Sequence, residues 1–218
     1  MKGISLLSGG KDSFFSTVIA IDQGMEILRS LTVLPEEFSM MYHFPNANKA
    51  SLVSDLLGIP WEKLTEDELA GRIKSLYHEG AEFLIAGATA SEYQKTRLEA
   101  MCSEIGISLY TPLWRIHPEI ILDKLLESGI TAIIVSVSAE GLVPSDLGSL
   151  LDRKYISHLK SVSSTTGINI VGEGGEYETF VTGYSGSSLK VNIERSKSIW
   201  NGSHGYFIIE DACLMPKI

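Results

Sequence analysis

Residues 8–13, Ser-Gly-Gly-Lys-Asp-Ser, lie between an apolar run at 4–7 and a second apolar segment at 14–19. This order predicts a strand, a tight loop and a helix. Two adjacent glycines let backbone N–H groups approach an oxyanion, and the start of the helix offers further N–H groups and the positive end of its dipole. The lysine adds a cation and the two serines add hydroxyl donors. The segment therefore predicts a phosphate-binding loop, with an ordinary glycine-rich turn as the alternative.

The loop differs from the common nucleoside-triphosphate loop at two positions. That loop has a glycine five positions before its Gly-Lys pair and a Ser or Thr after the lysine, whereas this chain has Ser5 and Asp12 at those positions. The sequence therefore favours another kind of phosphate chemistry.

Net charge, hydropathy and cysteine content disfavour several classes of function. The chain has 218 residues and a formal net charge of −9, so whole-molecule charge gives no attraction to nucleic acid or anionic lipid. No apolar run approaches the roughly 20 residues of a membrane-spanning helix, and we expect a cytoplasmic protein. The two cysteines, Cys102 and Cys213, are far apart and form no Cys-x-x-Cys pair, which disfavours a structural zinc site.

The first half of the chain alternates apolar, β-branched segments with amphipathic ones. The expected strands are 27–34, 82–86 and 109–110, and the expected helices are 48–57, 65–79 and 91–106. This alternation predicts an α/β fold with a mostly parallel, doubly wound sheet. Ligands of such sheets bind at the carboxyl ends of strands, where the loop at 8–13 and the loop at 87–90 are expected.

The second half differs. We expect helices at 118–128 and 145–159, a strand at 132–137, a period-two strand at 189–194 and its hairpin partner at 206–209. This pattern predicts a smaller, mixed α/β domain with an antiparallel end. We place the boundary near Ile116, which gives domains 1–116 and 117–218.

A second motif, Gly-Glu-Gly-Gly-Glu-Tyr-Glu-Thr, occupies residues 172–179. Three carboxylates this close repel one another unless a cation or water separates them, and three glycines are costly unless the loop needs unusual dihedral angles. A loop that binds Mg²⁺, an ammonium or a positively charged substrate explains both features. The alternative is a solvated acidic turn, in which the repulsion is weak.

Together these motifs resemble a known family. The loop at 8–13 resembles the pyrophosphate loop of the N-type ATP pyrophosphatases, which cleave ATP between its α and β phosphates. With Tyr93-Gln94, Arg97, Pro112-Leu113-Trp114, Gly141-Leu142 and residues 172–179, the chain resembles the diphthine ammonia ligase, or diphthamide synthase, family over nearly its whole length. Lys95 stands where that family usually has arginine, so a bidentate contact is lost there.

The resemblance implies a fold and a reaction. It implies an adenine nucleotide alpha hydrolase-like ATP-binding domain, residues 1–116, and a smaller substrate-binding domain, residues 117–218, across a cleft. It also implies that ATP activates the carboxylate of diphthine, a modified histidine on elongation factor 2, as an acyl-adenylate, and that ammonia then displaces AMP to give diphthamide. No glutaminase module is visible, so free ammonium is the expected nitrogen source.

The resemblance and the residue chemistry together assign candidate site residues. Expected to hold ATP are Ser8, Gly9, Gly10, Lys11, Asp12, Ser13, His43, Asn46 and Gly87. Expected to hold the substrate are Tyr93, Gln94, Arg97, Glu173, Gly174, Gly175, Glu176, Tyr177, Glu178 and Thr179. Lys11, Asp12, Glu176 and Glu178 are the expected catalytic groups, and Asp12 the expected Mg²⁺ ligand.

Within the substrate set, the acidic cluster and Tyr177 suit the trimethylammonium group of diphthine. Gln94 alternatively closes a helix with Ser91, and Tyr93 and Arg97 alternatively pack or pair on the surface. His43 and Asn46 alternatively form local loop bonds.

Two other functions remain as alternatives. One is an ATP pyrophosphatase that modifies transfer RNA, which the acidic charge disfavours. The other is a non-catalytic ATP-binding module. The expected partners are elongation factor 2 carrying diphthine and ammonium, without membrane or nucleic acid; the oligomeric state, a homodimer included, stays open.

Overall fold

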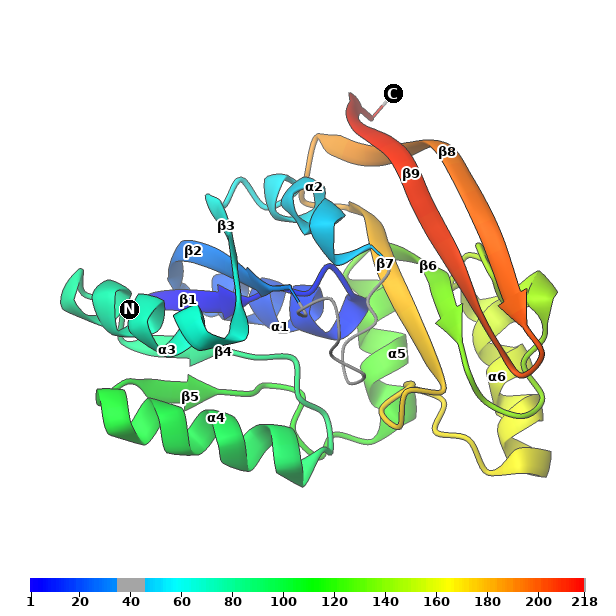
Figure 1. The fold of residues 1–218 in the computed structure, drawn as a ribbon, viewed down its shortest axis with the longest axis horizontal. Helices are drawn as coiled ribbons and strands as arrows, with labels where there is room; N and C mark the ends of the chain where they lie inside the picture. Colours follow the sequence, from blue (N-terminus) through cyan, green and yellow to red (C-terminus); the bar gives the residue numbers. More distant parts are fainter. Residues whose placement is uncertain (35–45, 218) are drawn as a thin grey trace. The chain divides into compact units, whose positions relative to one another are not determined.

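The chain folds as two compact units, Met1–Arg115 and Ile116–Ile218 (Figure 1). The structure, a computed structural model, describes residues 1–34 and 46–217. His43 lies outside the described residues, so its expected contact with ATP stays a prediction. Within the described ranges, no helix combines the length and apolar character needed to cross a membrane.

The first unit is built on a five-stranded sheet in the order β3-β2-β1-β4-β5. Its strands are β1 (Lys2–Leu6), β2 (Glu26–Val33), β3 (Trp61–Leu64), β4 (Phe83–Ile85) and β5 (Ser108–Tyr110). All four neighbouring pairs are parallel. This arrangement confirms the predicted α/β fold with a parallel, doubly wound sheet.

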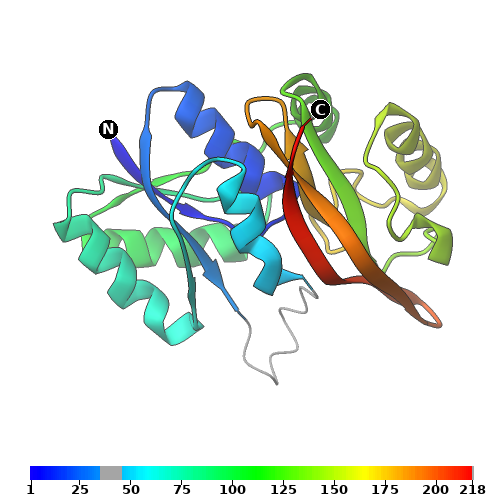
Figure 2. The same cartoon turned by 90° about the horizontal axis from the view of Figure 1, so that it is seen from above.

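Helices cover both faces of this sheet (Figure 2). They are α1 (Lys11–Asp22), α2 (Ala50–Asp55), α3 (Glu66–His78) and α4 (Glu92–Ile105), with a short 3₁₀ turn at Ala47–Lys49. Because side chains alternate along a strand, Leu84 packs in the cluster with Ile73 of α3 and Cys102 of α4, whereas Ile85 packs with Ala20 of α1. Burial also raises the pKa of the Cys102 thiol to about 11, as fits a core cysteine.

Local sequence signals fix the ends of these helices. The predicted capping box starts α3, because the Thr65 amide donates to Glu68 Oε2 at 2.8 Å. Ser91 precedes α4 and accepts from the amide of Gln94 at 3.4 Å, and Gly106 ends that helix with a left-handed φ of 89°.

An ion-pair network joins β2, β3 and α3. Glu62 accepts from Arg72 Nε at 2.6 Å and from Arg72 Nη2 at 2.8 Å, and also from Arg29 Nε at 2.8 Å. The hydrogen bonds from Arg72 are the main reason that the pKa of Glu62 lies below its ordinary value. The bidentate geometry makes this pair stronger than an ordinary surface ion pair.

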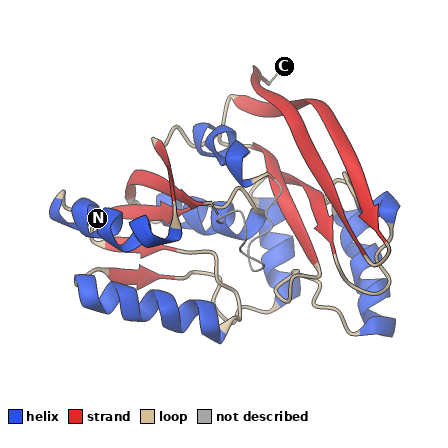
Figure 3. Ribbon diagram, viewed as in Figure 1, coloured by secondary structure: helices blue, strands red, loops and turns tan. Residues whose placement is uncertain are grey.

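The second unit carries four antiparallel strands and two α-helices (Figure 3). Its elements are α5 (Pro118–Glu127), β6 (Ile130–Val137), a 3₁₀ turn at Pro144–Asp146, α6 (Arg153–Thr166), β7 (Tyr177–Tyr184), β8 (Leu189–Asn201) and β9 (His204–Pro216). The expected hairpin is present and longer than predicted, since β8 and β9 each have 13 residues.

The strands of this unit form a closed ring in the order β6-β7-β8-β9. The ring closes through two residue pairs between β6 and β9, Ser136 with Tyr206 and Val137 with Gly205. Sequence periodicity predicts single strands but carries no signal for this long-range pairing, which is why closure was not anticipated.

The predicted helix at 145–159 is wrong in its first half. Gly148 has a φ of 82°, which no helix interior adopts, and its amide donates to Ile134 O at 2.8 Å. Ile134 N in turn donates to Ser149 O, and Leu151 N to Ala132 O, both at 2.9 Å. Residues 148–151 therefore lie along β6, and the helix begins only at Arg153.

Replacement of Glu62 by glutamine will lower the free energy of unfolding at pH 7 by about 1 kcal/mol, the upper range for an exposed pair. Because the pKa of Glu62 is lowered by folding, its contribution is present above the ordinary glutamate value of 4.5 and is lost as pH falls through the folded value. Urea unfolding of both proteins between pH 7 and pH 3 should show the difference disappear in acid. The exposed Glu104→Gln serves as the control, and a difference that persists at pH 3 would contradict the network's role.

Candidate functional site

The first candidate site lies where the sheet of the first unit changes its winding direction. Strands β1 and β4 are neighbours, with Gly3 opposite Phe83 and Ser5 opposite Ile85, although they are far apart in sequence. The chain crosses from β1 to β2 toward one edge of the sheet and from β4 to β5 toward the other edge. The loops at the carboxyl ends of β1 and β4 therefore diverge. Such a point is where α/β sheets bind ligands.

The loop at 8–13 follows β1 and is fixed by its own serines. Ser13 Oγ accepts from the Ser8 amide at 3.2 Å and donates to Gly10 O at 3.1 Å, while Ser8 Oγ accepts from the Gly10 amide at 3.3 Å. Gly9 has a φ of 91°, a left-handed value that favours glycine. The loop is thus organised before any ligand arrives, and it leads directly into the first turn of α1.

Lys11 and Asp12 form an ion pair within the loop. Lys11 Nζ lies 2.8 Å from Asp12 Oδ2, and the lysine side chain is only 4% exposed. The other oxygen, Asp12 Oδ1, is buried and accepts no hydrogen bond from the described residues. A buried acceptor without a donor is costly, and a cation or an ordered water satisfies it.

Asp12 therefore fits a Mg²⁺ ion as a single oxygen ligand. Magnesium commonly takes one or two carboxylates and completes its shell with water and phosphate oxygens. Among residues 1–34 and 46–217, no group of three or more acidic, His or Cys side chains is arranged to hold a metal. The protein would thus supply Asp12 and the nucleotide the remaining anionic ligands.

Gly87 brings the β4 loop against the β1 loop. A Cβ atom at Gly87 would lie 2.5 Å from Ser13 N and 2.6 Å from the carbonyl carbon of Asp12. Both neighbours are backbone atoms at the start of α1, which cannot move aside without changing the loop. The structure therefore places Gly87 beside the expected ATP loop, and only glycine fits there.

The remaining candidates of this unit are spread more widely. Tyr93 is 62% exposed near the start of α4, and Arg97 on the same helix pairs with Glu66 of α3. Gln94 takes part in the helix start through its backbone amide. Asn46 is buried and precedes the short turn at Ala47–Lys49. None of these positions tests contact with a ligand, so their assignments stay predictions.

The Gly-Glu motif forms the second candidate site, within the second unit. It joins the segment after α6 to the start of β7. Glu176 accepts from the Asn169 amide at 2.9 Å and from the Gly174 amide at 2.8 Å. Glu173, Gly175 and Glu178 are partly exposed, and Gly174 is exposed.

Two motif residues face inward. Tyr177 is 1% exposed and its hydroxyl donates to Ile170 O at 2.8 Å, while Thr179 is 5% exposed. The ring of Tyr177 is thus part of the core, and its expected contact with a trimethylammonium group stays a prediction. The alternating position of Tyr177 in β7 explains its burial, because residues two apart in a strand point to the same face.

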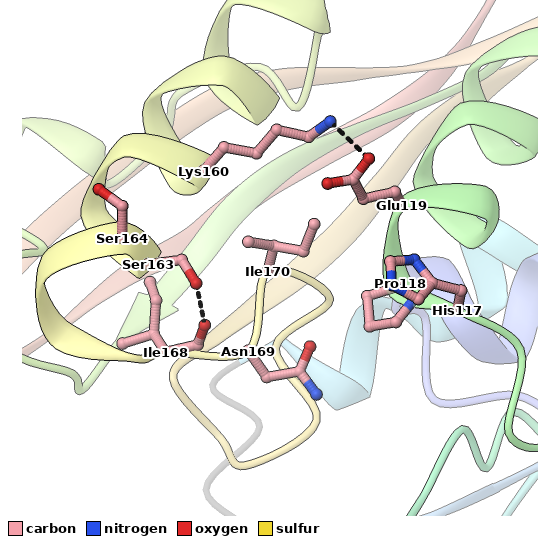
Figure 4. Close-up of a pocket in the computed structure, with 9 residues that line it drawn as sticks. All are labelled: His117, Pro118, Glu119, Lys160, Ser163, Ser164, Ile168, Asn169 and Ile170. Atoms are coloured by element: carbon pink, nitrogen blue, oxygen red, sulfur yellow. Dashed lines mark hydrogen bonds and ion pairs between the residues drawn. The ribbon is translucent and has the colours of Figure 1, made fainter.

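A pocket of about 460 Å³ lies between α5 and α6 of the second unit (Figure 4). Ile168 and Ile170 form an apolar floor, and Lys160 and Glu119 form a 3.0 Å ion pair at its edge. Asn169, whose amide is held by Glu176, lines the same pocket. Sequence reasoning did not single out these residues, because the pocket joins segments that are 40 or more positions apart along the chain and no local motif marks them.

Gly87→Ala will weaken ATP binding, since the added methyl group displaces the backbone at Asp12 and Ser13. We expect a loss of about 1–3 kcal/mol in stability, as for overpacking elsewhere, and a larger Kd for ATP by calorimetry. Gly71→Ala is the matched control, because a Cβ at Gly71 meets nothing within 4 Å and the residue lies inside α3. That variant should be neutral or more stable by about 0.5–1 kcal/mol. Equal behaviour of the two variants would show that the close approach has no consequence.

Comparisons with known proteins agree in both units. The chain matches the diphthamide synthase N-terminal domain over residues 1–109 and the diphthamide synthase C-terminal domain over residues 117–215. Diphthine–ammonia ligase of Danio rerio is 28% identical over an alignment that covers 91% of this chain and 89% of that protein. The human enzyme of the same name is 27% identical over an alignment that covers 94% of this chain and 88% of that protein.

A fungal relative is longer. Diphthine–ammonia ligase of Schizosaccharomyces pombe is 30% identical over an alignment that covers 83% of this chain but 34% of that protein. The present chain thus corresponds to about a third of the fission yeast protein and to most of the animal ones. Because the two family models account for nearly every residue of both units, the chain belongs to the diphthamide synthase family.

Proposed function

We propose that this protein is an ATP-dependent diphthine–ammonia ligase that acts on elongation factor 2. The observation that carries the proposal is the organised loop at 8–13 at the switch point of the sheet, in a chain whose two halves both match diphthamide synthase domains. The loop is the basis for the proposed reaction with ATP, and the family membership is the basis for the proposed substrate.

The reaction has two steps. The diphthine carboxylate attacks the α-phosphate of ATP, the bond between the α and β phosphates breaks, and an acyl-adenylate and pyrophosphate result. Ammonia, formed when ammonium loses a proton, then attacks the acyl carbon and AMP leaves with its electron pair. The attacking nitrogen gives up one further proton to water, and the amide of diphthamide remains. Adenylation is needed because a free carboxylate has no good leaving group.

The residues of the loop suit the first step. The N–H groups at the start of α1 and the Lys11 ammonium stabilise the negative charge that accumulates on the departing pyrophosphate. Mg²⁺ bound at Asp12 would neutralise further phosphate charge. Asp12 Oδ2 lies 2.8 Å from Lys11 Nζ, so this carboxylate keeps the lysine side chain within the loop.

The acidic motif at residues 172–179 suits the positively charged diphthine side chain. Diphthine carries a trimethylammonium group, and Glu173 and Glu178 are the partly exposed carboxylates of residues 172–179 besides Glu176. An attraction between opposite charges at a partly exposed site is worth about 1 kcal/mol. We assign this contact to the carboxylates alone, since Tyr177 is buried.

The charge of the chain disfavours the transfer RNA alternative. The net charge of −9 leaves no source of general phosphate attraction, and no second function is proposed.

Lys11→Met will reduce diphthine-dependent release of AMP and pyrophosphate by about 10²-fold or more, because it removes one cation from the leaving group. The methionine keeps the apolar stem of the buried side chain, so the far-UV spectrum should be unchanged. Lys74→Ala, on an exposed face of α3, is the control and should retain full activity. Product release would be followed with ATP, ammonium and elongation factor 2 carrying diphthine. Wild-type activity in Lys11→Met would refute the role of the loop.

Glu178→Gln will raise the KM for the diphthine protein by about fivefold, the equivalent of 1 kcal/mol of lost charge attraction, and leave the KM for ATP unchanged. The same assay with varied diphthine protein and then varied ATP separates the two constants. Glu140→Gln, an exposed residue of the same unit, controls for a general loss of negative charge. A change confined to the KM for ATP would refute the assignment.

A further inference from the structure

The carboxylate of Glu176 contacts the backbone of its own loop through both oxygens. Oε1 accepts from the Asn169 amide at 2.9 Å and Oε2 accepts from the Gly174 amide at 2.8 Å. Both oxygens are therefore engaged by backbone donors, and hydrogen bonds to an ionised acceptor are about twice as strong as neutral ones.

These two bonds span the loop. Asn169 precedes the motif and Gly174 lies in its middle, so the carboxylate ties the entering segment to the turn. Further backbone bonds run in the same direction: Gly172 N donates to Asn169 O at 2.9 Å and Gly175 N donates to Gly172 O at 3.2 Å. The loop thus closes on the Glu176 side chain.

Two glycines of the motif serve this closure. A Cβ at Gly174 would lie 3.0 Å from Glu176 Oε1, and a Cβ at Gly172 would lie 2.8 Å from Tyr177 O. Gly172 also has a φ of 78°, which favours glycine. At Gly175, by contrast, a Cβ meets nothing within 4 Å. Close approach to the backbone and a left-handed φ therefore explain the glycine at 172, whereas at 174 an added methyl group would press only on the Glu176 carboxylate.

The closed loop is also attached to the strands. Ser138 N, just after β6, donates to Glu176 O at 2.9 Å, and the Tyr177 hydroxyl donates to Ile170 O at 2.8 Å. Ile170 and Asn169 line the pocket between α5 and α6 (Figure 4). These bonds attach the segment 169–176 to the strands, and the Glu176 carboxylate holds the rest of the segment in place.

We propose that Glu176 is a positioning residue: its carboxylate holds the backbone at Asn169 and Gly174 and so sets the place of Glu173, rather than contacting the substrate. The proposal rests on the proposed function for what the loop receives. The proposal gives Glu176 a different role from Glu173 and Glu178, although the sequence motif alone does not distinguish the three carboxylates.

The hold of Glu176 on the loop backbone has a direct physical readout. Glu176→Gln keeps the side-chain length, but its amide nitrogen can accept from neither N–H group, so one of the two bonds is lost. Amide hydrogen exchange, followed by nuclear magnetic resonance on the full chain, should accelerate at Asn169 or Gly174. Glu178→Gln is the matched control and should leave both amides protected.

The kinetic pattern provides the second readout. Misplacement of the reacting group lowers kcat, whereas loss of a binding charge raises KM. We expect Glu176→Gln to lower kcat with the diphthine protein by about tenfold and to leave the KM for ATP within about twofold. Glu178→Gln should instead show mainly the higher KM for the diphthine protein.

A second variant displaces the Glu176 carboxylate without changing any charge. Gly174→Ala places a methyl group against Glu176 Oε1 and should reproduce both the faster exchange at Asn169 and the lower kcat. Exchange that is unchanged in both Glu176→Gln and Gly174→Ala would overturn the positioning role. A rise in KM alone for Glu176→Gln would instead assign Glu176 to substrate contact.

The outcomes also separate this inference from the proposed function. If the wild-type protein releases no AMP with the diphthine protein, the proposed function fails, while the exchange rates still decide whether Glu176 holds the loop. If the wild type is active and Glu176→Gln retains its kcat, the function stands and the positioning role falls.

Discussion

The parallel pairing of β1 with β4 is the constraint on which the first unit depends. It places the loop at 8–13 beside Gly87, and the contact is so close that a single methyl group at Gly87 would meet the backbone of α1. The buried clusters on the two faces of the sheet hold this pairing, because Leu84 packs toward α3 and α4 while Ile85 packs toward α1. The position of the loop at 8–13 is thus a consequence of how the sheet is wound and packed.

Both candidate sites are preorganised by polar side chains that accept hydrogen bonds from backbone amides of the same loop. In the first unit Ser8 and Ser13 bond to the loop they belong to, and in the second unit Glu176 does the same for residues 169–176. Each set of bonds removes loop freedom before a ligand binds. The ordering cost is then met during folding, so that less of the binding energy is spent on it.

Much of the architecture follows from local signals in the sequence. The capping box at Thr65 and Glu68, the proline that opens α5 and the glycine that ends α4 set helix ends with one-residue precision. The first half of the 145–159 helix could not be foreseen, because residues 148–151 gain backbone partners from β6, which lies earlier in the chain. The burial of Tyr177 and the two amide partners of Glu176 likewise depend on the path of the loop in space, and spacing along the chain carries no record of that path.

The partners of Glu176 bear on how this loop tolerates mutation. Both are main-chain amides, and every residue except proline supplies one. A substitution of the Asn169 side chain therefore keeps the amide from which Glu176 accepts, but it removes the bond in which the Val171 amide donates to Asn169 Oδ1 at 3.1 Å. A change at Glu176 removes the bonds to both amides. The frame of the loop therefore tolerates mutation least at positions 169 and 176, where a side chain holds the backbone.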